Sequence, residues 1–85
     1  MPKARKGIVQ IRFEILEYLY YNPEVQSRPH IWRRATTLSY DDFLKHLLYL
    51  IEKGLVKATE EGDCEITTHG RKIYDSLRNV LFSIL

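Results

Sequence analysis

The sequence predicts a single, mostly helical α+β domain, with three helices before a two-stranded β-hairpin and one long helix after it. Apolar residues recur every three or four positions, the spacing of one helical face, in three long segments. Gly54 ends the second of these segments. Two short segments of strand-like composition follow, Leu55–Thr59 and Cys64–Thr67, joined by the turn Glu60–Asp63. A chain of 85 residues is expected to form one domain, residues 1–85.

The first helix is predicted from Ile8 to Tyr21, where Asn22-Pro23 ends it. It carries two apolar stripes. One is predicted to face the core and consists of Ile8, Ile11, Ile15 and Leu19. The other has a spacing that suits packing against another helix and consists of Val9, Phe13, Leu16 and Tyr20. Arg12 lies between the stripes, where a guanidinium needs a carboxylate or carbonyl partner.

The second helix is short. Ser27 is predicted to cap it, and Pro29 is tolerated in its first turn. It is expected to end near Thr36, so residues 36–39 form a turn before the third helix.

The third helix is predicted over residues 40–53, with Ser39 as its N-cap and Gly54 in the left-handed position after it. At about 100° per residue the helix has two faces. The inward face consists of Tyr40, Phe43, Leu44, Leu47, Leu48, Leu50 and Ile51. The outward face consists of Asp41, Asp42, Lys45, His46, Tyr49, Glu52 and Lys53.

The last helix is predicted to begin at Thr67 or Thr68 and to run to about Ser83, within a C-terminal segment of residues 68–85. Its apolar arc is about 140° wide, more than one packing contact needs. Together with the second stripe of the first helix, this arc predicts a homodimer. The predicted interface consists of Val9, Phe13, Leu16, Tyr20, Tyr74, Leu77, Leu81 and Leu85.

The net charge of +2 is small but unevenly distributed. Basic residues without acidic neighbours occur in an N-terminal arm, residues 1–7, and around the second helix. These candidate phosphate contacts are Lys3, Arg5, Lys6, Arg28, Arg33 and Arg34. An arm that follows a DNA groove and a tail that only aids solubility are both consistent with the first cluster. The arginines around the second helix could instead belong to an ordinary solvated helix that contacts no phosphate.

No catalytic, metal or cofactor site is predicted. His30, His46 and His69 show no metal-ligand spacing with each other or with Cys64, and no nucleophile has an evident base. Cys64 is interpreted as a small apolar strand residue, and a single cysteine favours a reducing cytoplasm. No apolar run reaches the 18 residues of a membrane span, so a cytoplasmic protein without a membrane partner is expected.

Three motifs agree with this element order: Leu38-Ser39-Tyr40, the run Leu50-Ile51-Glu52-Lys53-Gly54-Leu55-Val56, and Ile66-Thr67-Thr68-His69-Gly70-Arg71. They resemble the small archaeal winged helix-turn-helix DNA-binding proteins and their viral relatives over about residues 8–81. The resemblance implies three bundled helices, a β-hairpin wing over residues 60–63, and a homodimer on double-stranded DNA. By position, it places Tyr40, Asp41, Asp42, Lys45, His46 and Tyr49 in the major groove, and Arg33 and Arg34 near phosphates.

The predicted function is a homodimeric transcription regulator, associated with the nucleoid, that contacts bases through Lys45, His46 and Tyr49. A dimer would present its third helices to half-sites roughly 34 Å apart. Asp41 and Asp42 suit either cytosine contacts or, as we prefer, the helix macrodipole. The outward face has three acidic residues against two basic ones, and the wing is acidic. A winged-helix protein-protein interaction module is therefore the alternative function.

Overall fold

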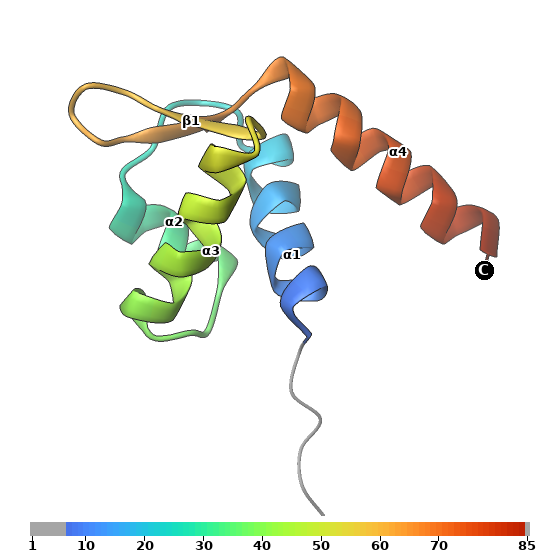
Figure 1. Ribbon diagram of the computed structural model, residues 1–85, viewed down its shortest axis with the longest axis horizontal. Coiled ribbons are helices and arrows are strands. Elements are labelled where there is room, and N and C mark those ends of the chain that lie inside the picture. Colours follow the sequence, from blue (N-terminus) through green and yellow to red (C-terminus); the bar gives the residue numbers. More distant parts are fainter. Residues whose placement is uncertain (1–6, 85) are drawn as a thin grey trace, which may run out of the picture.

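The computed structural model describes residues 7–84, with side chains described for residues 7–80. The elements follow the predicted order (Figure 1). They are α1 (Ile8–Tyr21), α2 (Arg28–Ala35), α3 (Tyr40–Glu52), β1 (Val56–Ala58), β2 (Cys64–Ile66) and α4 (Thr68–Ile84). The predicted fold class, a winged helix with three bundled helices, a hairpin and a C-terminal helix, is confirmed.

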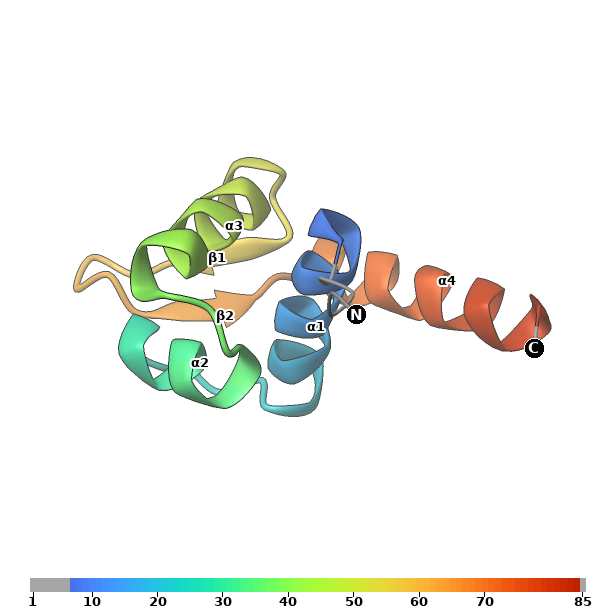
Figure 2. The same ribbon diagram turned by 90° about the horizontal axis from the view of Figure 1, so that it is seen from below.

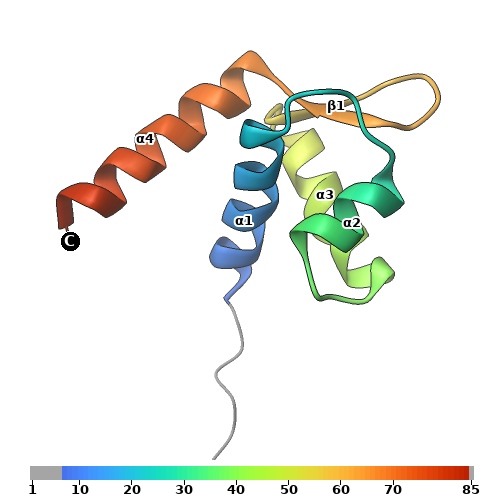
Figure 3. The same cartoon turned by 180° about the vertical axis from the view of Figure 1, so that it is seen from behind.

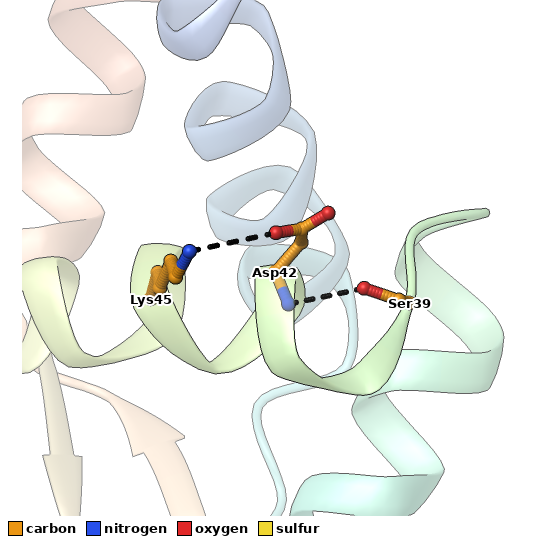
Figure 4. Close-up of polar contacts among 3 residues, drawn as sticks. All are labelled: Ser39, Asp42 and Lys45. Carbon is orange, nitrogen blue, oxygen red and sulfur yellow. Dashed lines mark hydrogen bonds and ion pairs between the residues drawn. The ribbon is translucent and has the colours of Figure 1, made fainter.

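Capping residues define the ends of α3. The Ser39 hydroxyl accepts a hydrogen bond from the Asp42 amide at 3.3 Å (Figure 4), which satisfies one of the free donors of the first turn. At the other end, the amides of Gly54 and Leu55 donate to the carbonyls of Ile51 and Leu50. Gly54 has a φ of 76°, so this is a Schellman ending that only glycine adopts without strain.

Trp32 stabilises the turn between α2 and α3 through two hydrogen bonds. Its indole Nε1 donates to the carbonyl oxygen of Leu38 at 2.6 Å, while the amide of Thr36 donates to the Trp32 carbonyl. The ring of Trp32 also lies edge-on to Tyr40, with 5.3 Å between the centroids. These contacts fix the start of α3 against α2.

The wing is a short antiparallel hairpin whose register pairs Val56 with Ile66 and Ala58 with Cys64. Gly62 supplies a φ of 88° in its turn. The sequence did not predict a third pairing: the amides and carbonyls of Gln26 and Cys64 exchange two hydrogen bonds of 2.9 and 2.8 Å. The segment between α1 and α2 therefore passes beside the hairpin (Figure 3).

The core lies where α1, α2, α3 and the hairpin meet. Its buried residues are Ile15, Leu16, Leu19, Ile31, Phe43, Leu47, Leu50, Val56, Cys64, Ile66 and Tyr74. Ile8, predicted to face the core, is instead 56% exposed at the start of α1. Leu48, also predicted to face inward, is 51% exposed, because the helix buries a narrower arc than its seven apolar residues span.

The first half of α4 packs on α1 of the same chain. The Tyr74 ring stacks on Phe13 at 5.2 Å, and its hydroxyl donates to Glu17 at 2.7 Å. Burial and this hydrogen bond raise the pKa of Tyr74 above its usual value. Leu16 and Tyr74 are only 2% and 1% exposed, so they belong to the protomer's own core. This corrects the prediction that these two residues form a surface for a partner.

Gly70 is a point of close contact between α4 and the rest of the domain. It is buried, and a Cβ at this position would overlap the carbonyl oxygen of Leu55 and lie 2.9 Å from Ile66 Cγ1. Thr67 begins the helix, because its hydroxyl accepts a hydrogen bond from the Gly70 amide at 2.9 Å. Beyond this close contact α4 runs outward, away from the hairpin (Figure 1).

Candidate nucleic-acid interface

α3 lies along one side of the molecule, away from α4 (Figure 2), and packs against α1 and α2. Asp41, Asp42, Lys45, Glu52 and Lys53 are exposed on its outward face, as predicted from the helical period. Lys45 Nζ lies 3.8 Å from Asp42 Oδ1 (Figure 4), and the two side chains are 78% and 57% exposed. Such an exposed pair is worth well under about 1 kcal/mol, so Lys45 can exchange its partner for a phosphate or a base.

Tyr49 is half-buried beneath Arg12 of α1. The Arg12 Cζ lies 3.5 Å from the centroid of the Tyr49 ring, and the Lys53 Nζ lies 5.5 Å from it. The sequence indicated that Arg12 needs a partner, but it did not show that an aromatic ring on α3 supplies one. The predicted base contact at Tyr49 is therefore limited to the parts of its ring and hydroxyl that Arg12 leaves uncovered.

His46, one turn before Tyr49 on α3, contacts the same arginine. Arg12 Nε donates to His46 Nδ1 at 3.3 Å, which leaves Nε2 as the nitrogen that carries the proton in the neutral ring. Burial lowers the pKa of His46, and the neighbouring Arg12 charge lowers it further. At neutral pH His46 is thus a neutral side chain with one N–H donor, a group suited to a base or phosphate oxygen.

Tyr40 was predicted to contact DNA, but most of its ring is used inside the domain. It packs against Trp32 and lies 5.9 Å from the ring of Phe43, centroid to centroid. Tyr40 is half-buried, so only part of its side chain is left for the DNA contact that the sequence suggested.

The three arginines of α2 have different surroundings. Arg33 is exposed beside Trp32, with Cζ 5.9 Å from the ring centroid. Arg34 is also exposed and lines an open hollow of about 500 Å³, to whose lining Glu14 and Glu17 also contribute. Arg28 is half-buried, and its Nε donates to the Gly62 carbonyl at 2.9 Å. Arg33 and Arg34 are therefore more accessible to a phosphate than Arg28 is.

The wing is acidic, as its sequence indicated. Glu60 and Glu61 are exposed at its tip, while Lys57 lies 3.8 Å from Glu65 across the strands. Cys64 is buried at the start of β2, next to the turn, and burial raises the pKa of its thiol, which disfavours the reactive thiolate.

The remaining predicted site residues lie outside the part of the chain whose side chains are described: Lys3, Arg5, Lys6, Leu81 and Leu85. Among the residues that are described, no group of three or more histidine, cysteine, aspartate or glutamate side chains could hold a metal ion. No helix within the described range is long and apolar enough to cross a membrane.

The model of the winged helix-turn-helix family matches residues 5–83, which is nearly the whole chain. The protein therefore belongs to the winged helix-turn-helix family. Domains of this class are typically DNA-binding domains without catalytic activity. No curated protein and no solved structure matches the chain significantly.

Proposed function

We propose that the protein is a transcription regulator that binds double-stranded DNA with α3 in the major groove. The observation that supports this most strongly is the exposed face of α3, where Lys45 lies on a capped helix beside the half-buried His46. Arg33 and the basic residues of the arm would neutralise phosphates beside the groove. Nucleoid association follows from this function.

The salt dependence of DNA binding tests the proposal. With four phosphate contacts, affinity for a random duplex should fall roughly 100-fold between 50 and 200 mM salt, because each neutralised phosphate contributes a slope of about −0.9. Fluorescence anisotropy with a labelled duplex measures this slope. No binding even at 50 mM salt would contradict the proposal.

We further propose that the protein binds as a homodimer through the diverging ends of α1 and α4. Apolar side chains are exposed on both helices: Val9 is 78% exposed, Leu77 is 41% exposed and Val80 is 56% exposed. A groove of about 190 Å³ lies between these helices and the end of α3, lined by residues that include Val9, Phe13, Ile73 and Leu77. Apolar side chains of a second α4 would pack on Val9, Leu77 and Val80, while Arg12 and Tyr49, which also line the groove, would remain outside the dimer interface.

A charged substitution on α4 tests the dimer. Leu77→Glu should shift the sedimenting species from about 20 kDa to the protomer mass of 10.1 kDa, because a carboxylate would be buried at the interface. Ser76→Glu, one position away and also exposed, is the matched control and should leave the dimer intact. A wild-type protein that sediments at 10.1 kDa at high micromolar concentration would rule the dimer out.

A protein-interaction module is the second candidate function, supported by the acidic wing. Glu60 and Glu61 are exposed where a DNA-binding wing would approach phosphates, and they would repel them. The titration with duplex DNA separates the two functions, since this candidate predicts no binding at low salt.

A further inference from the structure

Arg12 and Lys53 are two cations without an acidic partner at the junction of α1 and α3. Among residues 7–80, neither has a carboxylate within ion-pair distance. Arg12 is half-buried, whereas Lys53 is exposed. A partly buried guanidinium normally finds a carboxylate, because losing water without gaining a counter-charge is unfavourable. The positive charge at this junction is therefore uncompensated within the described protein.

The geometry brings these cations together. Both cations lie near the Tyr49 ring: Arg12 Cζ is 3.5 Å from the ring centroid, and Lys53 Nζ is 5.5 Å from it. The two cationic centres therefore lie within about 9 Å of each other, a separation at which like charges repel. An anion that contacts both cations would offset this repulsion.

Arg12 is also held in position before any ligand arrives. Its guanidinium stacks on Tyr49, and its Nε is engaged by His46 Nδ1, so its terminal nitrogens are left as donors in a fixed orientation. A guanidinium with its two terminal nitrogens free matches the oxygens of a phosphate. Lys53 is a flexible cation that can close on the same group.

The location favours a phosphate of the DNA backbone over a free anion. Tyr49 lies on α3 and Lys53 caps its C-terminal end, and the proposed function places this helix in the major groove. Arg12 follows Gly7 by five residues, about 7.5 Å along α1, so the cluster also lies near the attachment of the basic arm. Positive charge would thus continue from the arm to α3.

We propose that Arg12 and Lys53, brought together by the ring of Tyr49, form a subsite for one backbone phosphate of duplex DNA. This inference rests on the proposed DNA-binding function. It assigns a phosphate contact to α1 and to the last turn of α3, in addition to those of α2 and the arm.

The test compares Arg12→Gln, Lys53→Gln and the double variant in anisotropy titrations over a range of salt concentrations. Each single variant should weaken duplex binding roughly fivefold to tenfold at 100 mM salt and reduce the salt slope by up to about 0.9. The loss in the double variant should be smaller than the product of the single losses, because both cations contact the same phosphate. Lys72→Gln on α4 is the matched control and should bind like the wild type.

Folding effects are separated in two ways. Lys53 is exposed, so Lys53→Gln should unfold at the wild-type temperature while losing affinity. Arg12→Lys retains the charge but loses the bond to His46, and should keep the wild-type salt slope with reduced affinity. If the wild type binds duplex and both glutamine variants keep its affinity and slope, the phosphate subsite is overturned and the proposed function stands. If the wild type binds no duplex, the phosphate subsite and the proposed DNA-binding function are both overturned.

Discussion

Lys45→Glu is expected to weaken binding to duplex DNA at least tenfold at 100 mM salt. The substitution removes a cation that is 78% exposed at the centre of the α3 face and places a carboxylate where DNA phosphates would approach. It also adds a third acid beside Asp41 and Asp42, so the start of α3 would repel the duplex. Anisotropy titration at two salt concentrations measures the loss.

The control for this variant carries the same change of charge at a different place. Lys72→Glu lies on the exposed surface of α4 and should reduce affinity much less. The fold should tolerate both substitutions, since an exposed ion pair contributes well under about 1 kcal/mol and like charges one turn apart cost a few tenths. If the two variants lose affinity equally, the effect comes from net charge, and α3 is not the contact surface.

Gly70→Ala is expected to destabilise the protein by about 2–3 kcal/mol, which for a domain of this size lowers the melting temperature by roughly 10–20 °C. The added methyl group would collide with the backbone carbonyl of Leu55, and a backbone atom cannot move aside as a side chain can. Helix propensity acts in the opposite direction, since alanine is favoured over glycine by about 1 kcal/mol inside a helix. A loss of stability would show that the steric contact outweighs it.

Circular dichroism melting measures this change, and Gly7→Ala is the matched control. Gly7 has no atom within 4 Å of the position that a Cβ would occupy, and it caps α1 without a side-chain bond. Its replacement should cost less than about 1 kcal/mol. If Gly70→Ala melts at the wild-type temperature, α4 does not approach Leu55 as closely in solution as the structure has it.

Features that depend on neighbours in the sequence could be predicted well. Ser39 and Gly54 bound α3 as expected, because a cap and a glycine ending act through hydrogen bonds within a few residues. The turn at Gly62 was predictable for the same reason. The order of elements follows from these local signals.

Features that depend on tertiary contacts were not predictable. The pattern of α1 showed two apolar stripes, but it did not show that α4 of the same chain buries Leu16. Arg12 and Tyr49 are 37 positions apart, so no periodicity relates them. The Gln26 bridge involves one residue on each side and leaves no alternating pattern. The candidate site was therefore predicted on α3, while its α1 component came only from the structure.

The orientation of the wing depends on the backbone pairing of Gln26 with Cys64 as well as on the hairpin's own residues. A hairpin with three residues in each strand is too short to be stable alone. Here the pairing of Gln26 with Cys64, the first residue of β2 after the turn, and the bond from Arg28 to Gly62 within the turn both hold the end of the hairpin that carries the tip. The direction in which the wing points is thus set by the connection between α1 and α2, nearly forty residues earlier in the chain. Substitutions in that connection can redirect the wing without altering any residue of the hairpin itself.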